Sequence, residues 1–194
     1  MGGAYTSQSL QNNRLTGPIP TSINNASLFQ VLILQSNSFS APIPTFANLN
    51  LLSMFVLSDK QSIKSSTHDM QFLTSLTNSP YLNIIDISNN PLRGVLPNSI
   101  GNLSQSLELF RAYGTGIRGS IPSQIGNLIN LTALNLRDNQ LNGSIPSTIG
   151  NLKKLGGLFL AHNQLQGSIP IDLCMMSSLA EQQPAERSNT GMLG

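Results

Sequence analysis

The sequence predicts an α/β solenoid in which about seven repeats of about 24 residues each add one strand to a parallel sheet on the concave face. The first observation is a residue, usually Asn, that recurs at a nearly constant interval; we call its place the marker position. Its occupants are Asn13, Asn37, Lys60, Asn90, Thr115, Asn139 and Asn163, which lie 24, 23, 30, 25, 24 and 24 residues apart. The second observation is that apolar residues, a Gly and a Pro keep fixed distances from each marker.

A strand is predicted just before each marker, because apolar residues alternate there with polar or variable ones. Leu134 and Leu136 lie five and three residues before Asn139, and the other repeats keep this spacing. A period of two is typical of a strand with one buried face. The residues four, two and one positions before each marker are therefore expected to face solvent on the concave side.

After the strand, the chain is predicted to turn away from the sheet. A marker Asn that points inward needs hydrogen-bond partners for its amide, so stacked copies are expected to form a structural ladder of Asn13, Asn37, Asn90, Asn139 and Asn163. Four residues after the marker, a positive φ is expected at Gly17, Gly94, Gly119, Gly143 and Gly167. A Pro then fixes φ, and the Ile and Leu of "IGNL" are expected to face inward.

The organisation along the chain follows from where this pattern begins, breaks and ends. We expect an irregular N-terminal segment at 1–9, the solenoid at 10–179, and a divergent, disordered tail at 180–194, with no recognisable caps. The 30-residue step contains an irregular, helix-containing insert at about 61–81. In it, Ser66 and Asp69 fit a capping box, and Phe72, Leu73 and Leu76 fall on one helical face.

Composition and motifs argue against several function classes. Charged residues are 9% of the chain and the net charge is +2 without a basic run, which argues against nucleic-acid binding. The segment "GTGIRG" matches a dinucleotide fingerprint, but Ile121-Pro122 follows where a helix should open, so its last Gly is the repeat glycine. The two histidines, His68 and His162, and the single Cys174 form no metal or catalytic cluster, so no cofactor, metal or catalytic residue is expected.

The repeat consensus "LxxLxLxxNxLxGxIPxxIGNL" resembles the plant-specific leucine-rich repeat. In addition, "FLTSLTN" followed by "LPNSIGNLSQSLE" resembles the ectodomains of plant receptor kinases related to the flagellin, elongation-factor and rice blight-resistance receptors. The resemblance implies an internal fragment of a receptor-like serine/threonine kinase that acts in recognition and signalling, with immunity as the expected process. It also implies a plasma-membrane location on the extracellular side, a peptide or protein ligand, and a co-receptor ectodomain as partner.

Several features of such receptors are not visible in this sequence. We find no Val-Ala-Ile-Lys, His-Arg-Asp or Asp-Phe-Gly segment, so the chain itself is expected not to be an enzyme. No signal peptide or transmembrane segment is evident either. Two alternatives therefore stay open: a secreted inhibitor of a cell-wall-degrading enzyme, which uses a similar repeat, and an inactive product that is truncated or frame-shifted.

The candidate site residues follow from the strand pattern. Those predicted to share one ligand-binding patch across four adjacent repeats of the concave face are Asp86, Arg111, Tyr113, Arg137, Asp138, Phe159 and His162. Candidate N-glycosylation sites in Asn-x-Ser/Thr sequons are Asn25, Asn102, Asn130 and Asn142.

Overall fold

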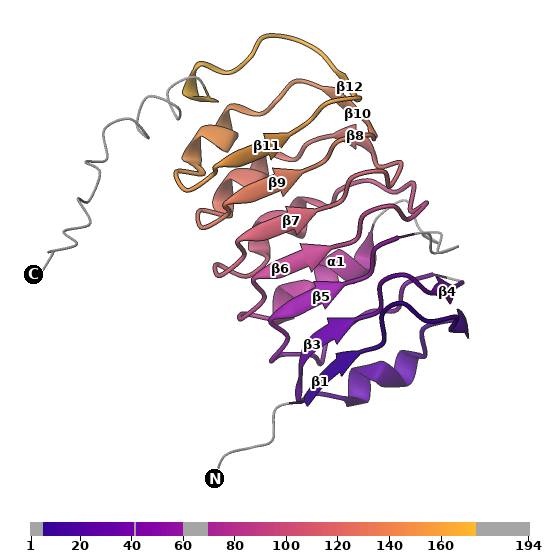
Figure 1. Ribbon diagram of the computed structural model, residues 1–194. Helices are drawn as coiled ribbons and strands as arrows, with labels where there is room; N and C mark the ends of the chain where they lie inside the picture. The colour runs from indigo at the N-terminus through magenta and orange to yellow at the C-terminus, as the bar shows by residue number, and fades with distance from the viewer. Residues whose placement is uncertain (1–5, 41, 60–69, 174–194) are drawn as a thin grey trace, which may run out of the picture.

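The computed structural model describes residues 6–40, 42–59 and 70–173, which build a solenoid around one parallel sheet (Figure 1). The sheet has seven strands in the order β1-β3-β5-β6-β7-β9-β11, so each repeat adds its strand beside the previous one. The predicted fold class is confirmed. The strands are β1 (Thr6–Ser9), β3 (Phe29–Ile33), β5 (Met54–Val56), β6 (Ile84–Asp86), β7 (Leu109–Arg111), β9 (Ala133–Asn135) and β11 (Gly157–Phe159).

The register of the sheet places equivalent residues of successive repeats side by side. Phe110 of β7 pairs with Ile85 on one side and with Leu134 on the other. Leu134 in turn pairs with Leu158 of β11. Because equivalent positions align, each position of the repeat becomes a continuous row of side chains across the sheet.

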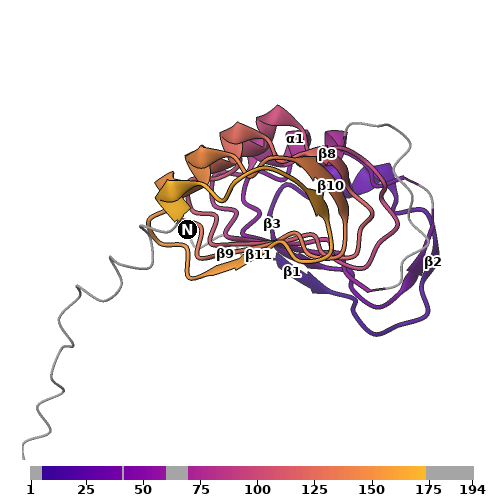
Figure 2. The ribbon, with the colours of Figure 1, turned by 90° about the horizontal axis from the view of Figure 1, so that it is seen from above.

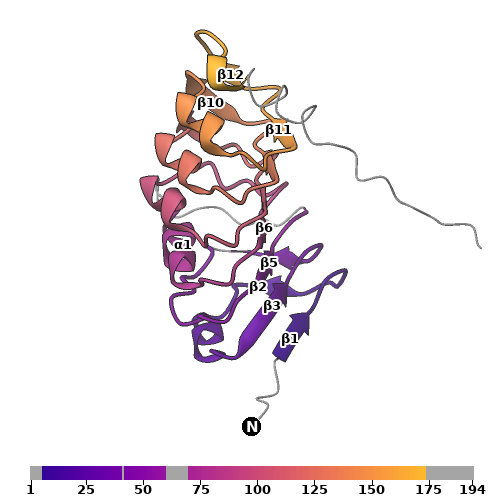
Figure 3. The ribbon, with the colours of Figure 1, turned by 90° about the vertical axis from the view of Figure 1, so that its left-hand side faces the viewer.

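Short helices form the opposite side of the solenoid (Figures 2 and 3). Four 3-10 helices each begin directly after a repeat Pro, whose extended backbone ends the preceding segment. The insert adds α1 (Gln71–Ser75) and the 3-10 helix η2 (Leu76–Asn78), where Phe72, Leu73 and Leu76 are buried as the helical pattern predicts. The four repeat helices are η1 (Thr21–Asn25), η3 (Asn98–Asn102), η4 (Ser123–Asn127) and η5 (Ser147–Asn151).

Between the sheet and the helices, the chain forms short secondary strands that the sequence pattern did not predict. β2 (Thr16–Gly17) pairs with β4 (Ser38–Phe39), and β10 (Gln140–Gly143) lies between β8 (Arg118–Ser120) and β12 (Gln164–Leu165). All of these pairs are parallel and join equivalent segments of neighbouring repeats. They therefore add a second set of backbone hydrogen bonds along the solenoid.

The core is a continuous apolar column between the sheet and the helices. Phe55, Ile85 and Phe110 from the strands are fully buried, and so are Ile125 and Ile149 from the helices. Neighbouring 3-10 helices approach so closely that a Cβ built on Gly126 would lie 2.3 Å from the carbonyl oxygen of Thr148. The Gly of "IGNL" is therefore required by helix–helix contact rather than by its backbone conformation.

Two sequence predictions are corrected by the backbone. Residues Thr6–Ser9 were expected to be irregular, but they form β1, because parallel pairing with β3 needs backbone groups and not the apolar side chains that this segment lacks. Gly94 was expected to have a positive φ, but the preceding Arg93 has it instead, at 55°. The other four repeat glycines, Gly17, Gly119, Gly143 and Gly167, do have positive φ. The capping box at Ser66 and Asp69 and the tail at 180–194 lie outside the described residues.

Candidate functional site

The solvent-facing side of the seven-stranded sheet is the concave face, and it presents three rows of side chains. Leu32, Phe55 and Ile85 point into the core with 0–1% exposure, so the residues on either side of them point to solvent. These rows lie six, four and two residues before the marker position. The predicted site residues belong to the rows four and two before the marker, or to the residue directly before it.

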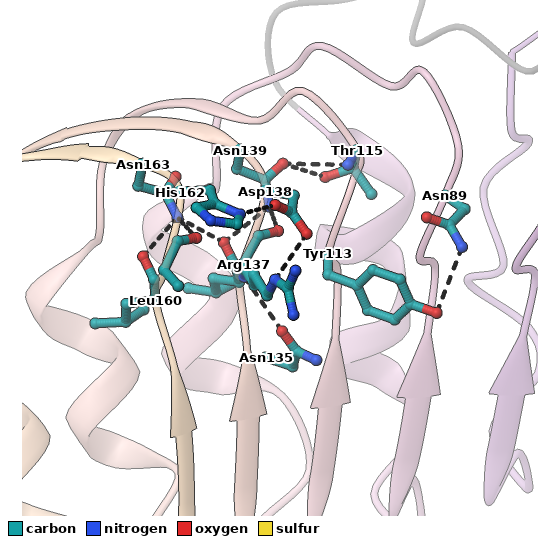
Figure 4. Close-up of polar contacts among 12 residues, drawn as sticks. Asn89, Tyr113, Thr115, Asn135, Arg137, Asp138, Asn139, Leu160, His162 and Asn163 are labelled. Atoms are coloured by element: carbon teal, nitrogen blue, oxygen red, sulfur yellow. Dashed lines mark hydrogen bonds and ion pairs between the residues drawn. The ribbon is translucent and has the colours of Figure 1, made fainter.

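The charged residues of the predicted patch form two separate ion-paired groups. Arg111 Nη1 lies 3.7 Å from Asp86 Oδ2 on the neighbouring strand. Further along, Asp138 accepts from Arg137 Nε at 2.9 Å and contacts His162 Nδ1 at 2.5 Å (Figure 4). All but Asp86 have side chains that are at least 40% exposed, so they are open to a partner.

The two aromatic residues of the patch are held in different ways. Tyr113 Oη accepts a hydrogen bond from Asn89 Nδ2 at 3.4 Å, and Figure 4 shows its ring lying toward Asn89. Phe159 is 51% exposed, and its ring lies close above its own strand at Gly157. The patch therefore spans β6, β7, β9 and β11, which are neighbours in the sheet.

The same face contains polar residues that the sequence reasoning did not select. Asn89 Nδ2 also donates to Asp59 Oδ1 at 2.9 Å, and Gln35 Nε2 lies 3.4 Å from Asp59 Oδ2. A chain of hydrogen bonds thus connects Gln35, Asp59, Asn89 and Tyr113 across four neighbouring repeats. The sequence could have identified these residues, because Asp59 and Asn89 directly precede marker positions, as Asp138 does.

The residue directly before each marker adopts a left-handed backbone. Its φ lies between 55° and 70° in all seven repeats. Asn, Asp and His are several-fold enriched in this conformation and Gly adopts it freely, which explains the residue types found there. The turn at this position ends the strand, and the marker side chain that follows is buried at Asn37, Asn90, Thr115 and Asn139. The seven residues are Asn12, Ser36, Asp59, Asn89, Gly114, Asp138 and His162.

The marker Asn side chains contact both their own turn and the preceding repeat. Asn139 Nδ2 donates to Leu136 O at 3.0 Å and to Ala112 O at 2.8 Å, while its Oδ1 accepts from Ile117 N at 2.9 Å. The same Oδ1 accepts from the backbone N and the Oγ1 of Thr115 (Figure 4). Asn37, Asn90 and Asn163 make the same two kinds of donation. Asn13, in the first repeat, bonds only carbonyls of its own turn.

An apolar area on the concave face was also missed. In the rows six and four before the marker, strands β3, β5, β6 and β7 carry partly exposed apolar side chains. Val31 pairs in register with Met54, and Ile33 with Val56. We call this area the apolar strip; its members are Val31, Ile33, Met54, Val56, Ile84 and Leu109.

The four sequons differ in the state of their Asn side chains. Asn25 and Asn102 are exposed and end the 3-10 helices η1 and η3, on the side opposite the sheet. Asn142 is exposed within β10. Asn130 is only partly exposed, and its Nδ2 donates to Gln105 O at 2.7 Å. Glycosylation of Asn130 would therefore have to break an inter-repeat hydrogen bond.

Two further features bear on the expected class of protein. Within the residues that the structure describes, no helix is long and apolar enough to cross a membrane. His68 and Cys174, for which no functional role was expected, lie outside those residues.

Sequence comparisons agree with the repeat pattern. The Leucine Rich Repeat family model matches residues 81–103 and 130–152. Over 94 residues the chain is 43% identical to a probable LRR receptor-like serine/threonine-protein kinase of Arabidopsis thaliana. That match covers 48% of this chain but 9% of the relative, so the chain spans a small part of it.

Solved structures extend the comparison to nearly the whole solenoid. The plant peptide hormone receptor RGFR1 in complex with RGF2 is similar with a TM-score of 0.76 and 34% identity, over 86% of this chain and 26% of that one. The Arabidopsis receptor kinase HAESA, solved with the peptide hormone IDA and the co-receptor SERK1, gives a TM-score of 0.71 and 28% identity over 88% and 32% of the two chains. The chain is thus a leucine-rich-repeat solenoid of the kind found in the ectodomains of plant receptor kinases.

Proposed function

We propose that the chain is the ligand-recognising part of a plant cell-surface receptor kinase and that its concave face binds a peptide or protein ligand. This proposal rests on the patch on β6, β7, β9 and β11, where two exposed arginines and two aromatic residues lie on one face of the sheet. Arg and aromatic residues are enriched among binding hot spots. The similarity to receptors solved with peptide hormones supports the same class of ligand.

The remaining roles follow from this proposal. The patch consists of Asp86, Arg111, Tyr113, Arg137, Asp138, Phe159 and His162, and a co-receptor ectodomain is the expected second partner. The repeats lie on the extracellular side of the plasma membrane, and exposed sequons such as Asn25 and Asn102 carry glycans there. The chain itself recognises and does not transfer phosphate; the immune process implied by the sequence resemblance remains a prediction.

The test replaces three patch residues in a membrane receptor that contains these repeats. Arg111, Tyr113 and Phe159 are changed together to Ala, and ligand binding is measured by titration calorimetry. The matched control changes Asn98, Ser123 and Ser147, three exposed residues on the 3-10 helices, to Ala. We expect at least a hundredfold loss of affinity in the first variant, from about 1 kcal/mol or more per hot-spot residue, and none in the control. The opposite pattern would place the site on the convex side.

A further inference from the structure

Asp59 is a carboxylate on the concave face whose charge is not matched by a cation among the described residues. The other two acidic side chains of this face are paired, Asp86 with Arg111 and Asp138 with Arg137 and His162. Asp59 instead accepts from two neutral amides, those of Asn89 and Gln35. Neutral donors leave its negative charge available to a cation from outside.

A cavity of about 520 Å³ opens beside this carboxylate. It is lined by Asn13, Ser36, Asn37, Ser38 and Asp59, which are hydroxyl, amide and carboxylate side chains. Asn37 is buried and its side chain bonds backbone carbonyls. Among the described residues of the lining, Asp59 is the one with a formal charge. The cavity therefore has the polarity to accept a cationic group together with its hydrogen-bond donors.

Most of the chain on either side of the lining residues is uncharged, apart from Arg14 and Lys60, which follow Asn13 and Asp59 in sequence. No Asp, Glu, Lys or Arg occurs between residues 15 and 58. Val56 of the apolar strip precedes Asp59 by three residues in the same repeat, and Ile33 precedes Ser36 in the same way. In both repeats a partly exposed aliphatic side chain therefore lies three residues before a residue that lines the cavity.

We propose that Asp59 and this cavity bind the guanidinium or ammonium group of an Arg or Lys side chain in an extended peptide, whose neighbouring apolar side chains pack on the apolar strip. This rests on the proposed function and adds to it the chemistry of the ligand. A carboxylate that receives such a cation forms charge-assisted hydrogen bonds, and among the described residues no cation is paired with Asp59. The hydrogen-bonded chain from Gln35 to Tyr113 holds Asp59 in position between this cavity and the patch.

The experiment pans a phage-displayed library of random dodecapeptides against three immobilised proteins: the 194-residue chain, Asp59→Asn, and the control Asp172→Asn, which changes an exposed carboxylate outside the patch and the apolar strip. Asn is well suited to the left-handed backbone of Asp59, at a φ of 70°, so this variant should fold. Asp59→Ser is a second variant, since Ser36 occupies the same place one repeat earlier with a φ of 55°. Circular dichroism compares the folding of all four proteins.

The proposal predicts that peptides selected on the unchanged chain contain Arg or Lys next to apolar residues. They should bind about tenfold more weakly to Asp59→Asn and Asp59→Ser, the effect of one lost charge-assisted hydrogen bond. Binding to the control Asp172→Asn should change less than twofold. Selected peptides without a basic residue, or binding to both Asp59 variants within twofold of the unchanged chain, would overturn this inference and leave peptide recognition intact. A library that yields no binder on the unchanged chain contradicts the proposed function itself.

Discussion

The side chain of Asn139 bonds to Ile117, which lies one repeat earlier, through its Oδ1 and the backbone N–H at 2.9 Å. The same amide donates back to Ala112 O and to Leu136 O, so one buried side chain connects two strands and two turns. Because other markers repeat this arrangement, the cohesion of the solenoid depends on polar groups as well as on its apolar column.

Replacing Asn139 with Ala should therefore lower the free energy of unfolding by about 3 kcal/mol, since several buried backbone groups lose their partner together. Asn13→Ala is the control, because Asn13 is exposed and bonds only its own turn. Urea unfolding followed by circular dichroism measures both variants. Equal destabilisation of the two would show that the inter-repeat bonds contribute little.

Gly126→Ala should also destabilise the chain, by about 1–3 kcal/mol, because the new Cβ would meet the backbone of the next helix at 2.3 Å. The matched control is Gly156→Ala, where the nearest atom to a built Cβ lies 3.8 Å away and φ is not positive. Differential scanning calorimetry should show a lower Tm for the first variant and an unchanged or higher Tm for the second. A Tm for Gly126→Ala equal to that of the unchanged chain would mean that the helices separate without cost.

Substitutions of Ser36 test whether the residue directly before a marker needs its left-handed backbone. It has a φ of 55° and is a residue type that does not favour this conformation. Ser36→Gly should raise the free energy of unfolding by about 0.5 kcal/mol, and Ser36→Val should lower it by about 1–2 kcal/mol. Chemical denaturation of both variants checks the order. If Val were tolerated as well as Gly, the positive φ would not be needed to end the strand.

Much of the fold was predictable because the solenoid is local in sequence. A strand, a turn and a short helix recur within 24 residues, so the spacing of Leu134, Leu136 and Asn139 was enough to place one repeat and hence its neighbours. The patch residues were assigned to the concave face by strand alternation alone. What could not be predicted depends on contacts between repeats. The start of β1 at Thr6 follows from backbone pairing with β3, which no side-chain pattern records. Nor does the repeat pattern indicate that Arg93, rather than Gly94, has the positive φ.

The binding features were predicted less completely for the same reason. Arg111 and Tyr113 were selected because their residue types suggest recognition. Val31 and Met54 are also partly exposed on the concave side, but they resemble core residues in sequence. Whether a carboxylate is paired also depends on the neighbouring strand. Asp86 and Asp59 differ in this respect although both lie on the same face.

The central claim, that ligand recognition occurs on the concave face, is tested most directly by photo-crosslinking. Benzoylphenylalanine replaces Tyr113 in one variant and exposed Ser123 of η4 in another, and each is irradiated with the tightest-binding selected dodecapeptide. Mass spectrometry of the adducts then reports which surface the peptide occupies. The account predicts adducts at position 113 that excess unlabelled peptide competes away, and none at position 123. Competed adducts at 123 with none at 113 would contradict it.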